Sequence, residues 1–492
     1  SPEQETPMPK DLTAASVTPF DRFARSLVDA GGVEAIRAGL IGEGHEIVTP
    51  FGTKTLTYAD YTASGRALMQ IEQMVLTEIL PVYSNSHTEA SHCGQQITRM
   101  RAAARAVVAR ETGAEADCHV IFGGSGATAG LNRLVALADV PRRVARGEDV
   151  RVIHGPFEHH SNLLPWRESG AKVTEIPRAP AGGVDLDALA AALAQTKGAD
   201  LVIGTFSAAS NVTGEITDVQ AVTRMLKDAG ALSVWDYACA GPYLPMQMTE
   251  DGVKKDAIVF SPHKFVGGPG ASGVLVVRDT MVCTDRPTQP GGGTVQFTSP
   301  WAEVYSPRVE AREEAGTPNV LGDIRAALAL EVKRVVGTEA MAAREHVLRA
   351  RALAAWADLP GLRLLSPAEN VPALPIFSFQ VTGAHGLVHP QLVTRMLSDM
   401  HGVQARGGCA CAGPFAHRLL GIDRATSEAL QKRLAAGDEM AKPGWTRLNL
   451  GWCHDDAQAD RIIAAVRDIV LRAESLAPLY TVDPATARWR AA

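Results

Sequence analysis

Ala257-Ile-Val-Phe-Ser-Pro-His-Lys264-Phe-Val-Gly-Gly-Pro-Gly270 joins a strand-like apolar run to a glycine-rich turn, and the fold class follows from what surrounds it. The four apolar residues have the length of a strand, and the serine and proline end it. A partly desolvated lysine at such a place forms Schiff bases with aldehydes, and glycines let the backbone approach a planar ligand closely. Taken alone, Lys264 is more simply interpreted as a solvated loop residue, so the choice between the two roles depends on the rest of the sequence.

The apolar run at 257–260 is one of several that alternate with helical stretches between about residues 50 and 325. Each run has strand length and is flanked by Gly, Ser, Pro or Asp. The other runs are 120–122, 152–154, 201–204, 233–236 and 274–277. This alternation predicts an α/β fold whose large domain has a mainly parallel sheet covered by helices on both faces. Ligands of such sheets bind outside the carboxyl ends of the strands, so the residues just after each run are candidates for chemistry.

The pattern changes after about residue 326, where we expect a smaller α+β domain. A helix over 341–358, a strand over 375–381 and a helix near 392–400 precede a Gly/Cys-rich loop. Near the start of the chain, residues 20–41 have helical spacing that a glycine pair interrupts. The expected boundaries are 1–49 for an N-terminal segment packing on the small domain, 50–325 for the large domain and 326–492 for the small domain.

Composition excludes several classes of protein. The chain has 492 residues, a net charge of −6 and no Lys/Arg block, so it lacks the clustered basic face that nucleic-acid binding needs. No apolar stretch approaches the ~20 residues of a membrane span, and residues 1–9 carry no secretory signal. Seven cysteines at irregular spacing do not predict a disulfide framework. We therefore expect a cytoplasmic protein with a small-molecule partner.

A second polar segment follows the run that ends at Phe122. Residues 123–128 read Gly-Gly-Ser-Gly-Ala-Thr and open a helix, so backbone N–H groups near Gly126 and Ala127 are expected to bind a phosphate. A Rossmann dinucleotide site has a similar loop, but no convincing strand-end acid follows at the expected interval. Asp236 ends another run, where a carboxylate can pair with a protonated pyridine nitrogen or cap a helix.

Three segments in this order resemble the class V aminotransferase-fold family of pyridoxal-phosphate enzymes, and within it the SUF-type cysteine desulfurases and selenocysteine lyases. They are Glu158-His-His-Ser-Asn-Leu-Leu-Pro-Trp166, Ser261-Pro-His-Lys264 with its glycine tail, and Ala315-Gly-Thr-Pro-Asn319. The resemblance spans roughly residues 55–455. It implies an aspartate aminotransferase-like fold, pyridoxal 5′-phosphate as the cofactor and a homodimer.

The resemblance also implies roles for individual residues around the cofactor. Lys264 would carry the Schiff base, His159 would stack on the ring and Asp236 would pair with the ring nitrogen. Asn211 would lie near the ring hydroxyl, although a turn role is open for it, as a core role is for His160. The residues that would hold the phosphate are Gly126, Ala127, Thr128, Ser261 and His263, with Thr317 reaching the phosphate of the neighbouring subunit.

The substrate end of the site is expected near Arg447, in Trp445-Thr-Arg-Leu-Asn-Leu450, which resembles the strand bearing the family's carboxylate-binding arginine. A guanidinium grips a carboxylate through two parallel hydrogen bonds, and lysine does not replace it well. Asn85 resembles a family position near the same carboxylate.

The loop Arg406-Gly-Gly-Cys-Ala-Cys411 resembles the family loop that leads to the nucleophilic cysteine. This register assigns the nucleophile to Cys411, with Arg406 at the substrate. Cys409 is an addition to the family pattern, and in an extended loop it would lie on the same side as Cys411, about 6 to 7 Å away. One alternative is half of a metal site, but no second ligand pair is present, so no metal is expected. The other alternative is a purely structural role for both cysteines as buried small apolar groups.

The sequence departs from the family at two further places. Cys239 stands where the family usually has a glutamine that bonds the ring hydroxyl. Residues 415–444 form a longer segment than in the compact desulfurases, with a charged helical part at 425–440 that would serve as a lid or a docking surface.

These residues together predict conversion of L-cysteine or a close analogue to L-alanine, with the sulfur held as a persulfide on Cys411 and then passed to an acceptor protein or a small thiol. The alternative is another class V reaction without a persulfide, such as a C–S or selenocysteine lyase, an epimerase or an aminotransferase. A third possibility is a sulfur carrier or regulatory protein that has lost catalysis. The residues do not distinguish sulfur from selenium.

Overall fold

The structure is a computed structural model that describes residues 17–367 and 370–492. Within these residues, seven strands form the larger sheet, in the order β4-β12-β11-β8-β7-β5-β6. Parallel pairing joins β11, β8, β7, β5 and β6, whereas β12 runs antiparallel to both of its neighbours. The strands are β4 (Cys118–Phe122), β5 (Val150–His154), β6 (Lys172–Glu175), β7 (Leu201–Ser207), β8 (Leu232–Asp236), β11 (Ala257–Phe260) and β12 (Val274–Arg278). The expectation of a mainly parallel α/β sheet is confirmed.

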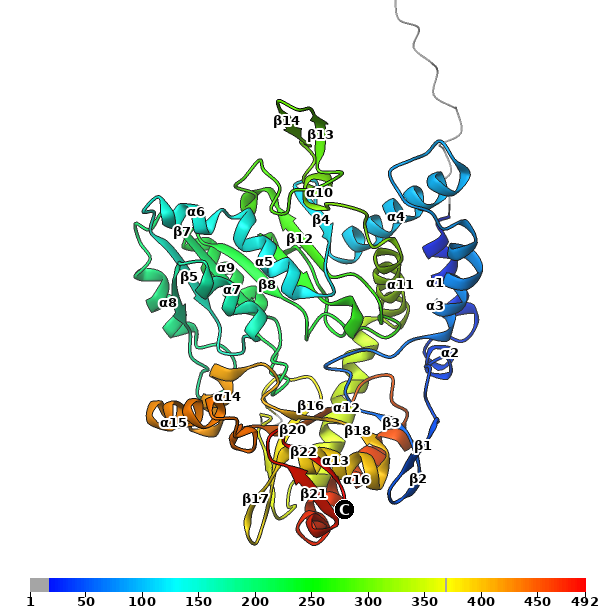
Figure 1. The fold of residues 1–492 in the computed structure, drawn as a ribbon, viewed down its shortest axis with the longest axis vertical. Coiled ribbons are helices and arrows are strands. Elements are labelled where there is room, and N and C mark those ends of the chain that lie inside the picture. Colours follow the sequence, from blue (N-terminus) through cyan, green and yellow to red (C-terminus); the bar gives the residue numbers. More distant parts are fainter. Residues whose placement is uncertain (1–16, 368–369) are drawn as a thin grey trace, which may run out of the picture.

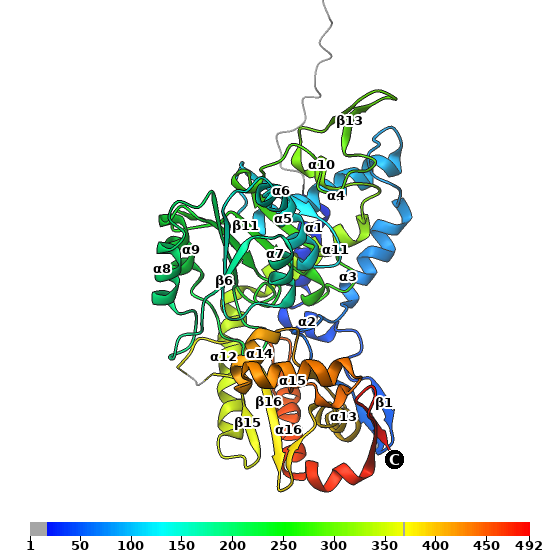
Figure 2. The ribbon, with the colours of Figure 1, turned by 60° about the vertical axis from the view of Figure 1, so that its left-hand side comes forward.

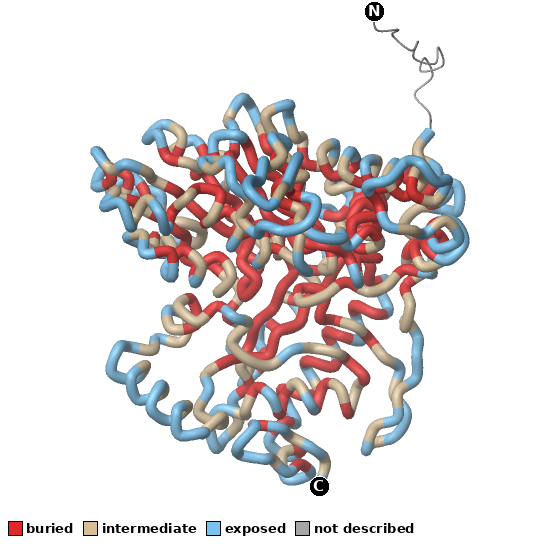
Figure 3. Tube along the Cα trace, turned by 45° about the horizontal axis from the view of Figure 1, so that its top comes forward, coloured by how far each residue is buried: buried red, intermediate tan, exposed pale blue. Residues whose placement is uncertain are grey.

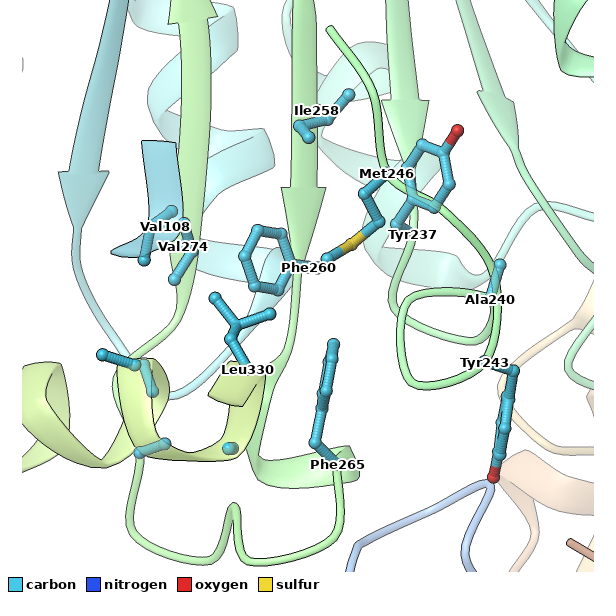
Figure 4. Packing of buried hydrophobic residues seen from close by; sticks show 14 of the residues in the cluster. Val108, Tyr237, Ala240, Tyr243, Met246, Ile258, Phe260, Phe265, Val274 and Leu330 are labelled. Atoms are coloured by element: carbon cyan, nitrogen blue, oxygen red, sulfur yellow. The ribbon is translucent and has the colours of Figure 1, made fainter. Parts of the chain in front are cut away.

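Helices cover both faces of this sheet (Figures 1 and 2). Every residue of β11 and β12 is buried, as the continuous apolar runs of these strands require. One face packs on α5 (Ala127–Leu137), α6 (Val140–Ala145) and α7 (Leu164–Glu168). The other packs on α4 (His92–Glu111), α8 (Leu186–Ala194), α9 (Val219–Asp228) and α11 (Val320–Val336). Figure 4 shows Phe260 of β11 meeting Leu330 of α11 in this second core.

A second sheet lies below the first in Figure 1 and has the order β15-β16-β20-β19, with β17 added on β16. Its strands are β15 (Leu362–Leu364), β16 (Ile376–Gly383), β17 (Gly386–Val388), β19 (Arg406–Gly408) and β20 (Trp445–Asn449). A separate apolar core joins it to α12 (Thr338–Trp356), α13 (Pro390–His401) and α16 (Asp456–Leu476). Between the last two strands, α14 (Gly413–Leu420) and α15 (Arg424–Ala435) form the extra segment, in orange in Figure 2.

The N-terminal helices differ from the sequence expectation. The glycine pair Gly31 and Gly32, both at positive φ, separates α1 (Pro19–Asp29) from α2 (Val33–Ala38) as predicted. However, α1 packs on α11 and α4, in the core of the seven-stranded sheet, and not on the small sheet. The apolar stripe Phe20, Phe23 and Leu27 is buried there because α11 offers a matching apolar face.

The following hairpin of β1 (Glu46–Thr49) and β2 (Gly52–Thr55) reaches the small sheet's side, where the Thr49 hydroxyl donates to the Asp399 carbonyl at 2.8 Å. Residues 1–16 of the expected N-terminal segment, including the polar start at 1–9, lie outside the described residues. In Figure 3, buried residues run from the upper sheet down toward the lower one. No helix in the described part of the chain has the length and apolar character to cross a membrane.

Candidate active site

A cavity of about 590 Å³ lies at the carboxyl ends of the parallel strands, closed on the opposite side by residues of β19 and β20. Its walls include residues that follow β4, β5, β7, β8 and β11, the places where the strand pattern predicted chemistry. The predicted cofactor residues in its walls are Gly126, Ala127, Thr128, His159, Asn211, Asp236, Cys239, Ser261, His263 and Lys264. The predicted substrate residues in its walls are Arg406, Cys411 and Arg447.

Two predicted residues lie elsewhere. Asn85 and Thr317 are exposed, and neither lines the cavity of its own chain. Asn85 lies in the loop before α4, and Thr317 in the turn before α11. Both residues therefore lie in loops outside the cavity of their own chain.

Lys264 occupies a short 3-10 turn, Pro262–Lys264, directly after β11. Desolvation lowers the pKa of its amine, and the nearby carboxyl of Asp236 only partly offsets this. A lysine with a lowered pKa has more of the neutral, nucleophilic amine at physiological pH. The structure therefore places Lys264 in the wall of the cavity and not in a solvated loop.

Asp236 ends β8 and is buried. Its Oδ1 accepts a hydrogen bond from the Ala238 N–H at 2.8 Å, which closes a turn and caps no helix. Burial raises the pKa of this carboxyl, while the Ala238 N–H and the Lys264 cation lower it. A buried carboxylate in this position would be stabilised by a cationic ring nitrogen, since opposite charge favours ionisation most strongly away from water.

His159 follows β5, and its Nδ1 accepts a hydrogen bond from the Ser161 N–H at 3.1 Å. Burial lowers the pKa of the ring to about 4, and the positive charges of Lys264 and Arg447 act in the same direction. The ring is thus a neutral aromatic face at physiological pH, which suits stacking on another ring.

We expect the His159 ring to stay neutral until the pH falls toward 4. Its pKa in the folded state lies below the ordinary value of ~6.5, so the His159 ring of the folded protein takes up no proton as the pH falls through 6.5. Histidine C2 hydrogen–deuterium exchange, read by mass spectrometry, reports the pKa of each ring. His119 is the internal reference, because Glu310 raises its pKa. A midpoint for His159 at or above that of His119 would contradict this account.

The phosphate-site prediction corresponds to a narrow cradle at the start of α5. The Ala127 N–H donates to Ser261 Oγ at 2.9 Å, and His263 Nδ1 contacts the Ser125 carbonyl at 2.6 Å. A Cβ on Gly126 would lie 2.6 Å from Ser261 Oγ and 3.0 Å from a ring carbon of His263. Only glycine fits between these side chains, and the Ser261 hydroxyl and the helix-start N–H groups are suitable donors for a phosphate.

Arg406 and Arg447 lie directly opposite each other on β19 and β20. Like charges in this position repel. Asp60 lies between them, with its Oδ2 3.0 Å from Arg406 Nη2 and its Oδ1 3.5 Å from Arg447 Nη2. Arg447 is buried, and its Nε has no hydrogen-bond partner among the described residues. The pair therefore retains donor capacity for a substrate carboxylate.

Asp60 is the residue that sequence reasoning missed. It follows β3 (Thr57–Tyr58), which pairs in parallel with β18 (Val403–Gln404) next to the small sheet. Thr62 and Ala63, two and three residues further on, line the cavity. A polar residue two positions after a short strand was the available signal, but the strand has only two residues and no clear alternation.

The cysteine loop is a tight turn, not the extended segment considered for it. The Ala412 N–H donates to the Cys409 carbonyl at 3.2 Å, and Ala410 and Cys411 between them have φ values of 53° and 52°. This is the geometry of a type I′ turn, which normally takes asparagine and glycine. A left-handed conformation costs an ordinary residue about 1–2 kcal/mol, so the turn is strained at both positions.

The turn separates the environments of the two cysteines. Cys411 is exposed and lines the cavity, whereas Cys409 is partly buried against an apolar cluster around Phe157 and Phe415. Cys239 is buried at the cavity wall, and burial raises the pKa of its thiol to about 11, which keeps it neutral. No group of three or more His, Cys, Asp or Glu side chains suited to a metal ion occurs in the described residues.

Residues 57–426 match the family model described as aminotransferase class-V. The chain is 30% identical over 362 residues to a cysteine desulfurase of Synechococcus elongatus, covering 72% of this chain and 55% of that protein. It is 28% identical to a probable cysteine desulfurase of Streptomyces coelicolor, covering 74% of this chain and 85% of that one.

Among solved structures, the chain resembles the cysteine desulfurase of Thermococcus onnurineus in its apo form. The TM-score is 0.71 at 24% identity, covering 89% of this chain and 98% of that one. The cysteine desulfurase of Escherichia coli gives the same TM-score, 0.71, at 23% identity, covering 90% and 98%. At this level of identity the likeness establishes the fold.

Proposed function

Because this chain belongs to the aminotransferase class-V family, we propose that it is a pyridoxal-phosphate-dependent cysteine desulfurase, which releases L-alanine and holds the sulfur as a persulfide on Cys411. The observation that carries the proposal is that Cys411 lines the same cavity as Lys264 and Arg447. Cysteine has an amine, a carboxylate and a thiol. In this cavity Lys264 would hold the aldehyde that captures the amine, Arg447 would bind the carboxylate and Cys411 would react with the sulfur. Its relatives named cysteine desulfurase support the same activity.

The residues of the cavity fit the cofactor. The cradle at Gly126 matches the phosphate in donor type and in its need for glycine. Asp236 is a buried carboxylate suited to a cationic ring nitrogen. Asn211 donates through its amide to the Ala410 carbonyl, which leaves its buried Oδ1 without a partner among the described residues and available to the ring hydroxyl. The neutral thiol of Cys239 stands where the family has glutamine, so it is the residue of this set with the weakest hydrogen-bonding capacity.

When bound, pyridoxal phosphate supplies an aldehyde that captures amines and a ring that withdraws electrons from the substrate Cα. Arg447 and Arg406 would orient the substrate through its carboxylate. Lys264 would hold the aldehyde carbon at rest and, once the substrate amine displaces it, accept the Cα proton at Nζ. His159 would cover one face of the ring as a neutral imidazole.

Cys411 would then act as a thiolate on the substrate sulfur. A new S–S bond forms to Cys411 while the Cβ–S bond breaks, and Cβ keeps the electron pair and takes up a proton to become the methyl group of alanine. The persulfide sulfur is then available to an acceptor protein or a small thiol.

The direct test is to incubate the purified holoenzyme with L-cysteine, measure alanine, and measure the intact mass before and after a reductant is added. One alanine and one reductant-sensitive sulfur per chain in the first turnover is the expected result. Sulfide or a keto acid without added mass would indicate a class V lyase or aminotransferase instead. A parallel incubation with L-selenocysteine compares the two chalcogens.

We also propose that the active form is a cytoplasmic homodimer in which Thr317 reaches the partner's phosphate site. Thr317 is exposed and does not line the cavity of its own chain, as a role in the partner's phosphate site requires. Thr317→Ala is expected to weaken cofactor retention on dialysis while the protein stays dimeric in sedimentation velocity, because one phosphate donor is lost. A stable and fully active monomer would refute the proposal.

A further inference from the structure

The turn that carries Cys411 is held by groups from the opposite side of the cavity. It follows β19 of the small sheet, yet its hydrogen bonds run to residues beyond β5 and β7 of the large one. Two consecutive ordinary residues in a left-handed conformation do not persist unless the surroundings determine them. The residues that hydrogen-bond to the turn therefore help to fix the position of the Cys411 thiol.

His160 makes two of these contacts. Its backbone N–H donates to the Cys411 carbonyl at 2.8 Å, and its ring Nε2 accepts from the Gly413 N–H at 2.9 Å. Asn211 adds the third, from its side-chain amide to the Ala410 carbonyl at 2.9 Å. The two His160 bonds bracket the turn, one at the nucleophile's own carbonyl and one at the first residue of α14.

The ring of His160 is matched to this contact. A backbone N–H can only bond to a ring nitrogen that carries no proton, so His160 must be neutral with its proton on Nδ1. Burial lowers the pKa of the ring, which favours the neutral form. A Cβ at position 413 would lie 3.0 Å from Nε2, so glycine at this position permits the close approach.

We propose that His160 is a positioning residue that clamps the strained Ala410–Cys411 turn, and so holds the Cys411 thiol in line with the substrate sulfur. The inference rests on the proposed function, since it concerns the nucleophile of that reaction. His160 thus has a purpose beyond that of a satisfied core histidine. Its side chain does not touch the reacting atoms; it acts through the backbone at Gly413.

The test combines a deletion, a conservative replacement and a release of strain. His160→Ala should lower the rate of first-turnover persulfide formation about 10- to 100-fold, because a displaced reacting group costs on this order. The KM for L-cysteine and the cofactor absorbance should change by less than about threefold, because Arg447 and Lys264 are untouched. His160→Gln, whose side-chain oxygen can accept from Gly413, should recover part of the loss. Ala410→Gly alone should have little effect, but in the His160→Ala background it should restore turnover several-fold, because glycine adopts the turn without strain.

A second readout is independent of activity. Amide hydrogen exchange across residues 409–416 should accelerate in His160→Ala, and less so in His160→Gln. His417→Gln is the matched control, since the ring of His417 hydrogen-bonds to the Gly413 carbonyl and to Ser427, and it should leave exchange at 409–412 and turnover unchanged.

Unchanged exchange in His160→Ala, or faster exchange with normal persulfide formation, would overturn the proposal, as would the absence of rescue by Ala410→Gly. If the wild type forms no persulfide, the proposed function fails, and the exchange comparison alone then decides whether His160 clamps the turn.

Discussion

Replacing Cys411 with alanine is expected to lower alanine release from L-cysteine by at least about a thousandfold, the scale on which enzymes lose activity with their nucleophile. Cys411 lines the cavity beside Lys264 and Arg447, and it would accept the substrate sulfur there. Cofactor binding should be retained, because the side chains of the phosphate cradle and Asp236 lie on other segments. Alanine quantified in the first turnover, together with intact mass, measures the effect.

Cys409→Ala is the matched control for this variant. Its thiol packs on the cluster around Phe157 and does not line the cavity, so the first turnover should remain within a few-fold of wild type. Normal alanine formation in Cys411→Ala with an inactive Cys409→Ala would move the nucleophile to Cys409. Normal formation in the double variant would reject the persulfide mechanism.

Replacing Lys264 with alanine is expected to remove both the covalent link to the cofactor and at least about a thousandfold of the turnover, since one amine holds the aldehyde and moves the Cα proton. The wild-type protein should be yellow, and borohydride treatment should fix the cofactor on the peptide that contains Lys264. In the variant, the absorbance of the lysine-linked cofactor and the modified peptide should both be absent.

Lys333 provides the comparison for this result. Lys333 is buried, burial lowers its pKa to about 7, and it donates to the Gly241 carbonyl at 2.7 Å. A lowered pKa alone therefore does not identify the reactive lysine. Lys333→Met should keep the cofactor on Lys264, and a modified peptide that contains Lys333 in place of Lys264 would show that the assignment is misplaced.

The family and the fold class were predictable from the sequence, and the comparisons confirm them. The family followed from the resemblance of three motifs. The fold class followed because strand-length apolar runs followed by Gly, Ser and Asp report local conformation, and parallel strands bring their carboxyl ends to one edge. The meeting of Gly126, Asp236 and Lys264 in one cavity could therefore be predicted without any knowledge of tertiary contacts, although these residues are far apart in the sequence.

Tertiary structure decided the features that depend on how the two sheets face each other. Asp60 lies between Arg406 and Arg447 only because β3 pairs beside the small sheet, and α1 packs on α11 because that helix offers the matching apolar face. The turn at Cys411 is the clearest case. Nothing in Ala-Cys favours a left-handed conformation, which is held instead by hydrogen bonds from His160 and Asn211. Residue type sets what each segment prefers locally, whereas contacts between segments far apart in the chain can impose a conformation against that preference.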